Sequence, residues 1–118
     1  MAETMEKKMR LGDLYDHYGR LLTPKQQAIL DQYCLDDLSL AEISENLEIS
    51  RQAVFDTVRK VEKQLEELEN SLNLLARYEK RKELLNEALG LTNRLTDEKP
   101  VQAKVLHRLR DLITEALE

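Results

Sequence analysis

The residues from Ser50 to Ala88 include neither glycine nor proline, the two residues that most often end a helix. Within this stretch, apolar side chains recur at alternating steps of four and three residues: Val54, Val58, Val61, Leu65, Leu68, Leu72 and Leu75. Such spacing aligns side chains along one helix face, as in the seam of a coiled coil. The sequence therefore predicts a single helix of about 35 to 40 residues, roughly 55 Å long, which ends at Gly90.

So long a helix needs a partner along its apolar seam, because exposed rows of Leu and Val are unfavourable in water. Either the helices at the two ends of the chain fold back on the seam, or a second copy pairs with it. The length favours a second copy, since this helix extends beyond a compact globule of 118 residues. Beyond Leu75 the apolar line shifts to Tyr78, Leu84, Leu85, Ala88 and Leu89. We expect a homodimer.

Two helix starts lie close together at this end of the stretch. One precedes it, and the other is its first residue. Ser39 is followed three residues later by Glu42, which is the reciprocal arrangement of a capping box. Ser50 precedes Arg51, so its hydroxyl can accept a free amide hydrogen at the start of the next helix. The connector of Leu47, Glu48 and Ile49 allows only a tight corner. Residues 39–63 are therefore predicted to form a helix-turn-helix.

Two further helices are expected before this motif and one after it. Residues 3–20 carry apolar side chains at threes and fours, and Thr23-Pro24-Lys25-Gln26 has the cap, proline and glutamine of a strong helix start. After a polar stretch at 92–99, Pro100 can open a final amphipathic helix suited to packing or dimerisation. The apolar face of the first helix consists of Met5, Met9, Leu11, Leu14, Tyr15, Tyr18 and Leu22. That of the last consists of Val101, Val105, Leu106, Leu109, Leu112, Ile113, Ala116 and Leu117.

The composition agrees with an all-α fold and excludes several classes of protein. Leu, Glu, Lys and Ala are abundant, with three Gly, two Pro and one cysteine, Cys34, which cannot form an internal disulfide. No apolar run is long enough to span a membrane, and the N-terminus lacks the apolar core of a signal peptide, so we expect a cytoplasmic protein. No phosphate-binding loop, catalytic triad or set of metal ligands is present. We expect that the protein is not an enzyme and that it needs no cofactor or metal.

The formal charge of −5 is unevenly distributed, which bears on binding to nucleic acid. Residues 39–49 carry −3, residues 50–63 carry +2, and residues 64–89 carry −2. The second helix of the motif is therefore the basic stretch of an acidic protein. Because nonspecific affinity for nucleic acid depends on neutralising phosphates, this helix is the predicted contact.

The second helix of the motif has an inward and an outward face. Val54, Val58 and Val61 face inward, and at about 100° per residue the polar residues fall on the opposite arc. Arg51 and Gln52, in the first turn, are placed to read guanine and adenine edges in a DNA groove. Arg59, Lys60 and Lys63 are placed for phosphates, and Phe55 either contacts a thymine methyl group or packs on a neighbouring helix. The predicted DNA-binding residues are Ser50, Arg51, Gln52, Phe55, Asp56, Arg59, Lys60 and Lys63.

Two resemblances follow from these residues. Residues 20–63, with LTPKQQAIL, SLAEISENLEIS and SRQAVFDTVRK, resemble region 4 of bacterial sigma factors, the C-terminal DNA-binding module. More specifically, YGRLLTPKQQAIL and YCLDDLSLAEISENLEISRQAVFDTVRK, together with the following Glu/Leu-rich helix, resemble the YlxM family of small all-helical bacterial proteins. The latter covers residues 8–85 and implies a link to the signal recognition particle pathway. The sigma-like module implies that Arg51, Gln52, Phe55, Asp56 and Arg59 face the groove.

We therefore expect an all-α protein with a helix-turn-helix domain at residues 1–63 and a dimerising extension at 64–118. The main hypothesis is a DNA-binding regulator. The alternative is a factor that binds protein or RNA of the signal recognition particle pathway through its long helix. A third possibility is that the motif is only a folding unit and the dimer regulates another factor.

Overall fold

A computed structural model describes residues 4–95 and 103–117, and within these ranges the chain is helical and contains no strand. The all-α class with a helix-turn-helix is thus confirmed. The chain divides into a first unit, Met1–Leu75, and a second unit, Ala76–Glu118. The helices are α1 (Met5–Tyr18), η1 (Gly19–Leu21), α2 (Pro24–Leu30), η2 (Asp31–Leu35), α3 (Leu40–Leu47), α4 (Arg51–Leu72), α5 (Leu74–Leu95) and α6 (Ala103–Leu117).

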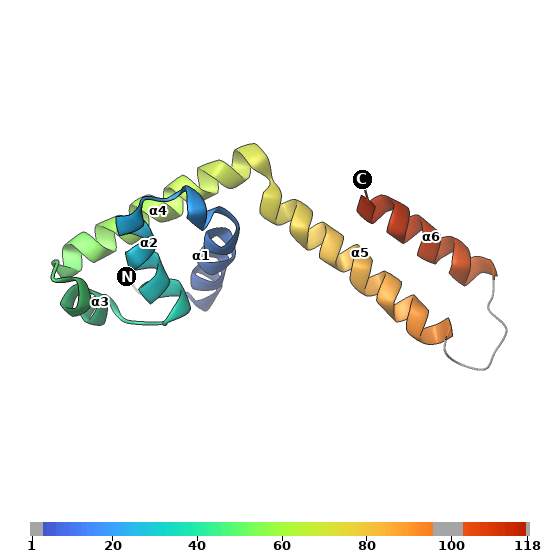
Figure 1. Ribbon diagram of the computed structural model, residues 1–118, viewed down its shortest axis with the longest axis horizontal. Helices are drawn as coiled ribbons and strands as arrows, with labels where there is room; N and C mark the ends of the chain where they lie inside the picture. Colours follow the sequence, from blue (N-terminus) through green and yellow to red (C-terminus); the bar gives the residue numbers. More distant parts are fainter. Residues whose placement is uncertain (1–3, 96–102, 118) are drawn as a thin grey trace. The chain divides into compact units, whose positions relative to one another are not determined.

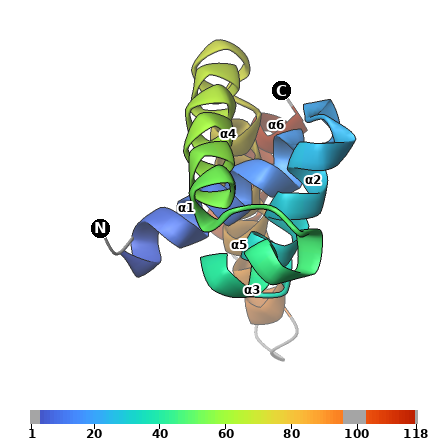
Figure 2. The same ribbon diagram turned by 90° about the vertical axis from the view of Figure 1, so that its left-hand side faces the viewer.

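In the first unit, α1, α2 and α3 all pack against α4 (Figures 1 and 2). The inward face predicted for the second motif helix is confirmed, because Val54, Val58 and Val61 are at most 3% exposed. Figure 2 shows α1, α2 and α3 gathered along α4. The buried core of this unit comprises Leu11, Leu14, Tyr15, Tyr18, Leu22, Ile29, Leu30, Ile43, Val54, Val58, Val61, Leu65 and Leu75.

The predicted starts of α2, α3 and α4 are confirmed. Thr23 and Ser39 each form a complete capping box, with Gln26 and Glu42 as the reciprocal partners. The hydroxyl of Ser50 accepts a hydrogen bond of 3.0 Å from the amide of Ala53. Side chains within four residues of each helix start therefore satisfy amides that the helix itself leaves free.

The first helix departs from the prediction at its N-terminal end. Met5 and Met9 were placed on its apolar face, but they are 75% and 63% exposed. The buried part of α1 begins at Leu11, where α4 covers it. At the other end of the chain, Pro100 and Val101 lie outside the described residues.

The predicted continuous helix from Ser50 to Gly90 is wrong. The chain leaves the helix at Asn73, whose φ of 55° and ψ of 29° are left-handed. Asparagine tolerates this conformation better than most residues, because its short polar side chain can hydrogen-bond locally. The second helix, α5, then continues through Gly90 as far as Leu95, so Gly90 ends no helix.

Most of the seam expected to pair with a second copy is instead covered by the chain itself, although Leu72 is 43% exposed. Val54, Val58, Val61, Leu65 and Leu75 belong to the same core as side chains of α1, α2 and α3. The break at Asn73 makes this possible, since α4 alone is short enough for the N-terminal helices to cover. A homodimer would therefore need another surface.

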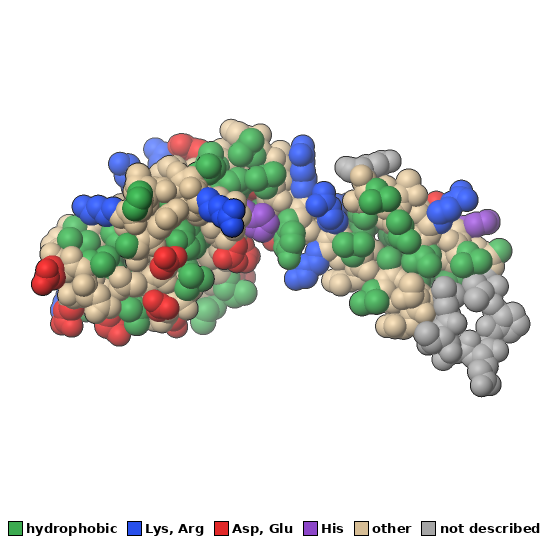
Figure 3. Space-filling view, in the orientation of Figure 1, with side chains coloured by type: hydrophobic (Ala, Val, Ile, Leu, Met, Phe, Trp, Pro, Cys, Tyr) green, Lys and Arg blue, Asp and Glu red, His purple; other side chains and the backbone are tan. Residues whose placement is uncertain are grey.

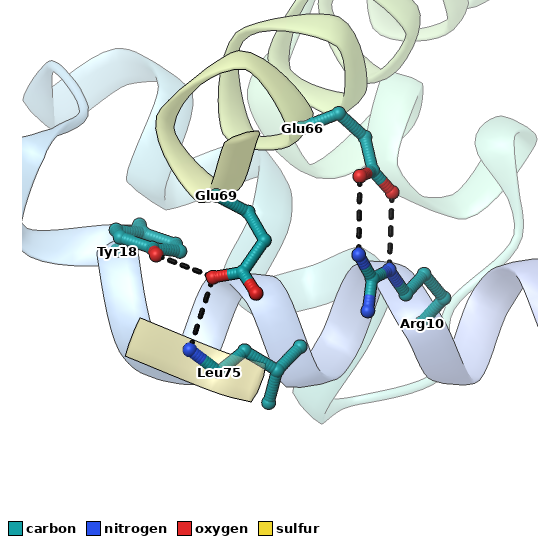
Figure 4. Close-up of polar contacts among 5 residues, drawn as sticks. All are labelled: Arg10, Tyr18, Glu66, Glu69 and Leu75. Carbon is teal, nitrogen blue, oxygen red and sulfur yellow. Dashed lines mark hydrogen bonds and ion pairs between the residues drawn. The ribbon is translucent and has the colours of Figure 1, made fainter. Parts of the chain in front are cut away.

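A buried carboxylate stabilises the junction between α4 and α5 (Figure 4). Glu69 is 5% exposed, and its Oε1 accepts hydrogen bonds from the Tyr18 hydroxyl at 2.5 Å and the Leu75 amide at 3.0 Å. The Leu74 amide donates to the Tyr18 oxygen at 3.1 Å. Burial, followed by the hydrogen bond to Glu69, raises the pKa of the Tyr18 phenol, so the hydroxyl remains a donor. Two of the free amides at the start of α5 are thus satisfied by α1 and α4.

We predict that Glu69→Ala lowers the free energy of unfolding by about 1–3 kcal/mol, because it leaves the Leu75 amide and the Tyr18 hydroxyl buried without this acceptor. Urea denaturation measures the change. Glu67→Ala, at an exposed position two residues earlier on α4, is the matched control. Equal urea midpoints for the two variants would show that the buried carboxylate does not stabilise the junction.

We also predict that Asn73→Ala destabilises the chain by roughly 1 kcal/mol, since alanine pays the steric cost of the left-handed conformation. Asn73→Gly should have the same free energy of unfolding as the parent to within a few tenths of a kcal/mol, because glycine adopts positive φ without strain. Thermal unfolding followed by circular dichroism compares the two. If the alanine variant were the more stable, a left-handed residue would not be what separates α4 from α5.

Candidate nucleic-acid interface

The turn between α3 and α4 is fixed by backbone and side-chain hydrogen bonds. Glu48 adopts φ 56° and ψ 41°, and its amide donates to the Ser44 carbonyl. The Ser44 hydroxyl donates to the Ile49 carbonyl at 2.6 Å, and the Ile49 amide returns to the Ser44 carbonyl at 3.2 Å. Ile43 is fully buried, and Leu40, Leu47 and Ile49 pack against the core. These contacts give α4 a defined direction relative to α3.

The predicted binding residues lie on α4 and at its start. Ser50 is the N-cap, and the side chains of Arg51, Gln52, Asp56, Lys60 and Lys63 are exposed. Phe55 and Arg59 are half-buried. The structure thus leaves the two residues expected to read bases, Arg51 and Gln52, accessible in the first turn of α4.

Contacts along α4 engage four of these residues with one another. The Arg59 guanidinium lies 5.2 Å from the centre of the Phe55 ring, within the range of a cation–π interaction. The amide nitrogen of Gln52 donates to Asp56 Oδ1 at 2.8 Å, one turn further along the helix. Phe55 therefore serves as a platform for Arg59, and Gln52 and Asp56 must separate before the Gln52 amide can donate to a base.

The electrostatic surroundings of this face are mixed. Glu42, Glu45 and Glu48 are exposed on α3 and the turn, immediately before the basic residues of α4. Figure 3 shows acidic side chains gathered over the lower part of the first unit. Because nucleic acid is a polyanion, contact would have to be confined to α4 and its N-terminus, away from the outer face of α3.

A second basic segment, Arg77–Lys82, was hidden when charge was summed over residues 64–89. It holds Arg77, Lys80, Arg81 and Lys82 against the single acid Glu79, a net charge of +3 in six residues. All four basic side chains are exposed on α5, and Figure 3 shows Lys and Arg side chains over the first part of that helix. The Nζ atom of Lys80 lies 3.9 Å from Oε1 of Glu115. A narrower charge window would have found this segment.

In residues 4–95 and 103–117, no group of three or more His, Cys, Asp or Glu side chains is arranged to hold a metal ion. Over the same part of the chain, none of the helices combines the length and apolar character needed to cross a membrane.

Comparison with known proteins identifies the family. The sequence model described as "Putative helix-turn-helix protein, YlxM / p13 like" matches residues 5–108. A UPF0122 protein of Geobacillus sp. (strain WCH70) is 49% identical over 83 residues, which are 70% of this chain and 76% of that protein. UPF0122 protein YlxM of Bacillus subtilis (strain 168) is 40% identical over 102 residues, 86% of this chain and 93% of that protein. A relative from Exiguobacterium sp. (strain ATCC BAA-1283 / AT1b) is 42% identical over 106 residues, 90% and 98% of the two chains. The chain therefore belongs to the YlxM / p13-like family of helix-turn-helix proteins.

Proposed function

We propose that this protein is a non-enzymatic, cytoplasmic regulator that binds duplex DNA as a homodimer, with α4 as the recognition helix. The observation that carries the proposal is the first turn of α4. There Ser50 caps the helix, and Arg51 and Gln52 stand exposed directly after a fixed turn. This is the part of a recognition helix that contacts base edges in the major groove. Membership of a helix-turn-helix family supports the same role.

The residues of the face divide by chemistry. Arg51 can donate two hydrogen bonds to guanine, and Gln52 can pair with adenine once it releases Asp56. Lys60 and Lys63 are exposed ammonium groups further along α4, suited to phosphates. Stacking on Phe55 restricts the Arg59 guanidinium, so less side-chain entropy is lost when it meets a phosphate.

Selection from a pool of random duplexes at low salt, followed by affinity measurements on the enriched site, tests this proposal. Arg51→Ala should cost about 1–3 kcal/mol on the enriched site and relax preference at one base position. Lys63→Ala should weaken binding to all duplexes alike and reduce the slope of log K against log salt by about 1. Failure to enrich any sequence at low salt would rule out sequence-specific recognition.

A second candidate function is binding of RNA in the signal recognition particle pathway. The observation that favours it is the basic segment Arg77–Lys82, which lies outside the helix-turn-helix. Among the described residues, the cationic groups of Arg77, Arg81 and Lys82 have no carboxylate within 4.0 Å. Tyr78, which is 49% exposed beside them, offers a ring on which an unpaired base can stack.

One triple variant distinguishes RNA binding by the basic segment from DNA binding by α4. Arg77→Ala/Arg81→Ala/Lys82→Ala should weaken binding to signal recognition particle RNA at least roughly tenfold, since three phosphate contacts are lost. Its affinity for the selected DNA should not change. The matched control is Arg94→Ala/Lys104→Ala/Arg110→Ala, which removes three exposed charges from α5 and α6 outside the basic segment. Equal RNA affinity for the two triple variants would exclude the basic segment as an RNA contact.

A further inference from the structure

The second unit is an antiparallel pair of helices with a small core. Ion pairs join Lys80 to Glu115 and Glu87 to Arg108, so a step of seven residues up α5 matches seven residues down α6. Leu84, Ala88 and Leu112 are buried between the helices, with Leu91, Leu109 and Ala116 packed around them. A hairpin of about 40 residues cannot bury enough apolar surface to be stable by itself.

Each helix also carries a second row of apolar side chains that this core leaves exposed. Tyr78, Leu85 and Leu89 on α5 are 49–60% exposed, and Leu106, Ile113 and Leu117 on α6 are 45–82% exposed. Both rows have the same spacing, seven residues and then four. At about 100° per residue, each row falls within an arc of about 40°. Figure 3 shows hydrophobic side chains gathered over this unit.

The two rows lie on the same side of the hairpin. On each helix the exposed row is rotated by about 100° from the buried residues, in the direction of increasing residue number. Because the helices are antiparallel, equal rotations in this sense bring both rows to one side. The partners of the two ion pairs are rotated in the opposite sense on both helices and occupy the other side. The hairpin therefore has one ion-paired side and one apolar side.

We propose that a second copy of this chain covers the apolar face formed by Tyr78, Leu85, Leu89, Leu106, Ile113 and Leu117, so that two hairpins form a four-helix bundle. The six side chains expose roughly 600 Å² per copy, or about 1,200 Å² in a pair, the lower limit for specific, stable interfaces. A two-fold axis through the face would bring rows of identical spacing against each other, and a bundle of four helices closes the core that two helices leave open. The inference rests on the homodimer of the proposed function and names the surface that forms it.

Sedimentation equilibrium of the full chain at micromolar concentration, without DNA, tests the inference. The parent should have the mass of two chains. Leu85→Glu/Ile113→Glu should raise the dimer Kd at least roughly 100-fold, because a carboxylate would be buried without a partner. The control, Asn86→Glu/Thr114→Glu, adds the same charge at adjacent exposed positions, which lie opposite the core and about 80° around each helix from the centre of the apolar row. It should remain a dimer.

A gentler variant covers the possibility that the glutamates unfold the hairpin. Leu85→Ala/Ile113→Ala keeps helix propensity and adds no charge, and it should weaken the dimer while the helical circular dichroism stays at the parent's level. A monomeric parent would refute the dimer. A dimer of unchanged Kd in both the glutamate and alanine variants would refute this face. Since no DNA is present, neither result depends on whether α4 binds DNA.

Discussion

The first unit depends on the burial of one side of α4. Val54, Val58, Val61 and Leu65 are at most 3% exposed, and the three preceding helices all pack on the surface that they form. A single helix with such a stripe is unstable in water, and α1, α2 and α3 cannot bury their own apolar residues without it. The same burial leaves the opposite side of α4 facing solvent. The exposure of the candidate binding residues is therefore a consequence of how the core is formed.

Local features of the fold could be predicted from the sequence because their causes are local. A capping box such as Ser39 with Glu42 involves residues three apart, and the inward Val54, Val58 and Val61 follow from helical periodicity. The end of α4 has a different kind of cause. Asn73 is a modest signal alone, and the buried Glu69, four residues before it, is satisfied partly by Tyr18, 51 residues away in the chain. Periodicity also could not decide whether the seam meets its own chain or another, since both arrangements require the same residues.

For the candidate site, the sequence predicted which side chains are exposed better than it predicted which contacts they make with one another. The polar arc of α4 follows from angles about the helix axis, and the structure leaves Arg51 and Gln52 exposed in its first turn. The pairing of Gln52 with Asp56 and the stacking of Arg59 on Phe55 depend on rotamers, which spacing allows but does not select. The basic segment Arg77–Lys82 was missed for a simpler reason, because neighbouring glutamates cancelled its charge in a long window.

The distance in sequence between Tyr18 and Glu69 also has a consequence for synthesis on the ribosome. The start signals of α2, α3 and α4 act within four residues, so these helices can begin to form as they emerge. By contrast, α1 obtains its cover from α4 only after about fifty more residues have been translated, which takes roughly 3–10 s at ordinary elongation rates. Until then α1 can pack on η1 and η2 but not on α4. The nascent chain therefore exposes the apolar face of α1, with Leu11, Leu14 and Tyr18, before the first unit can close.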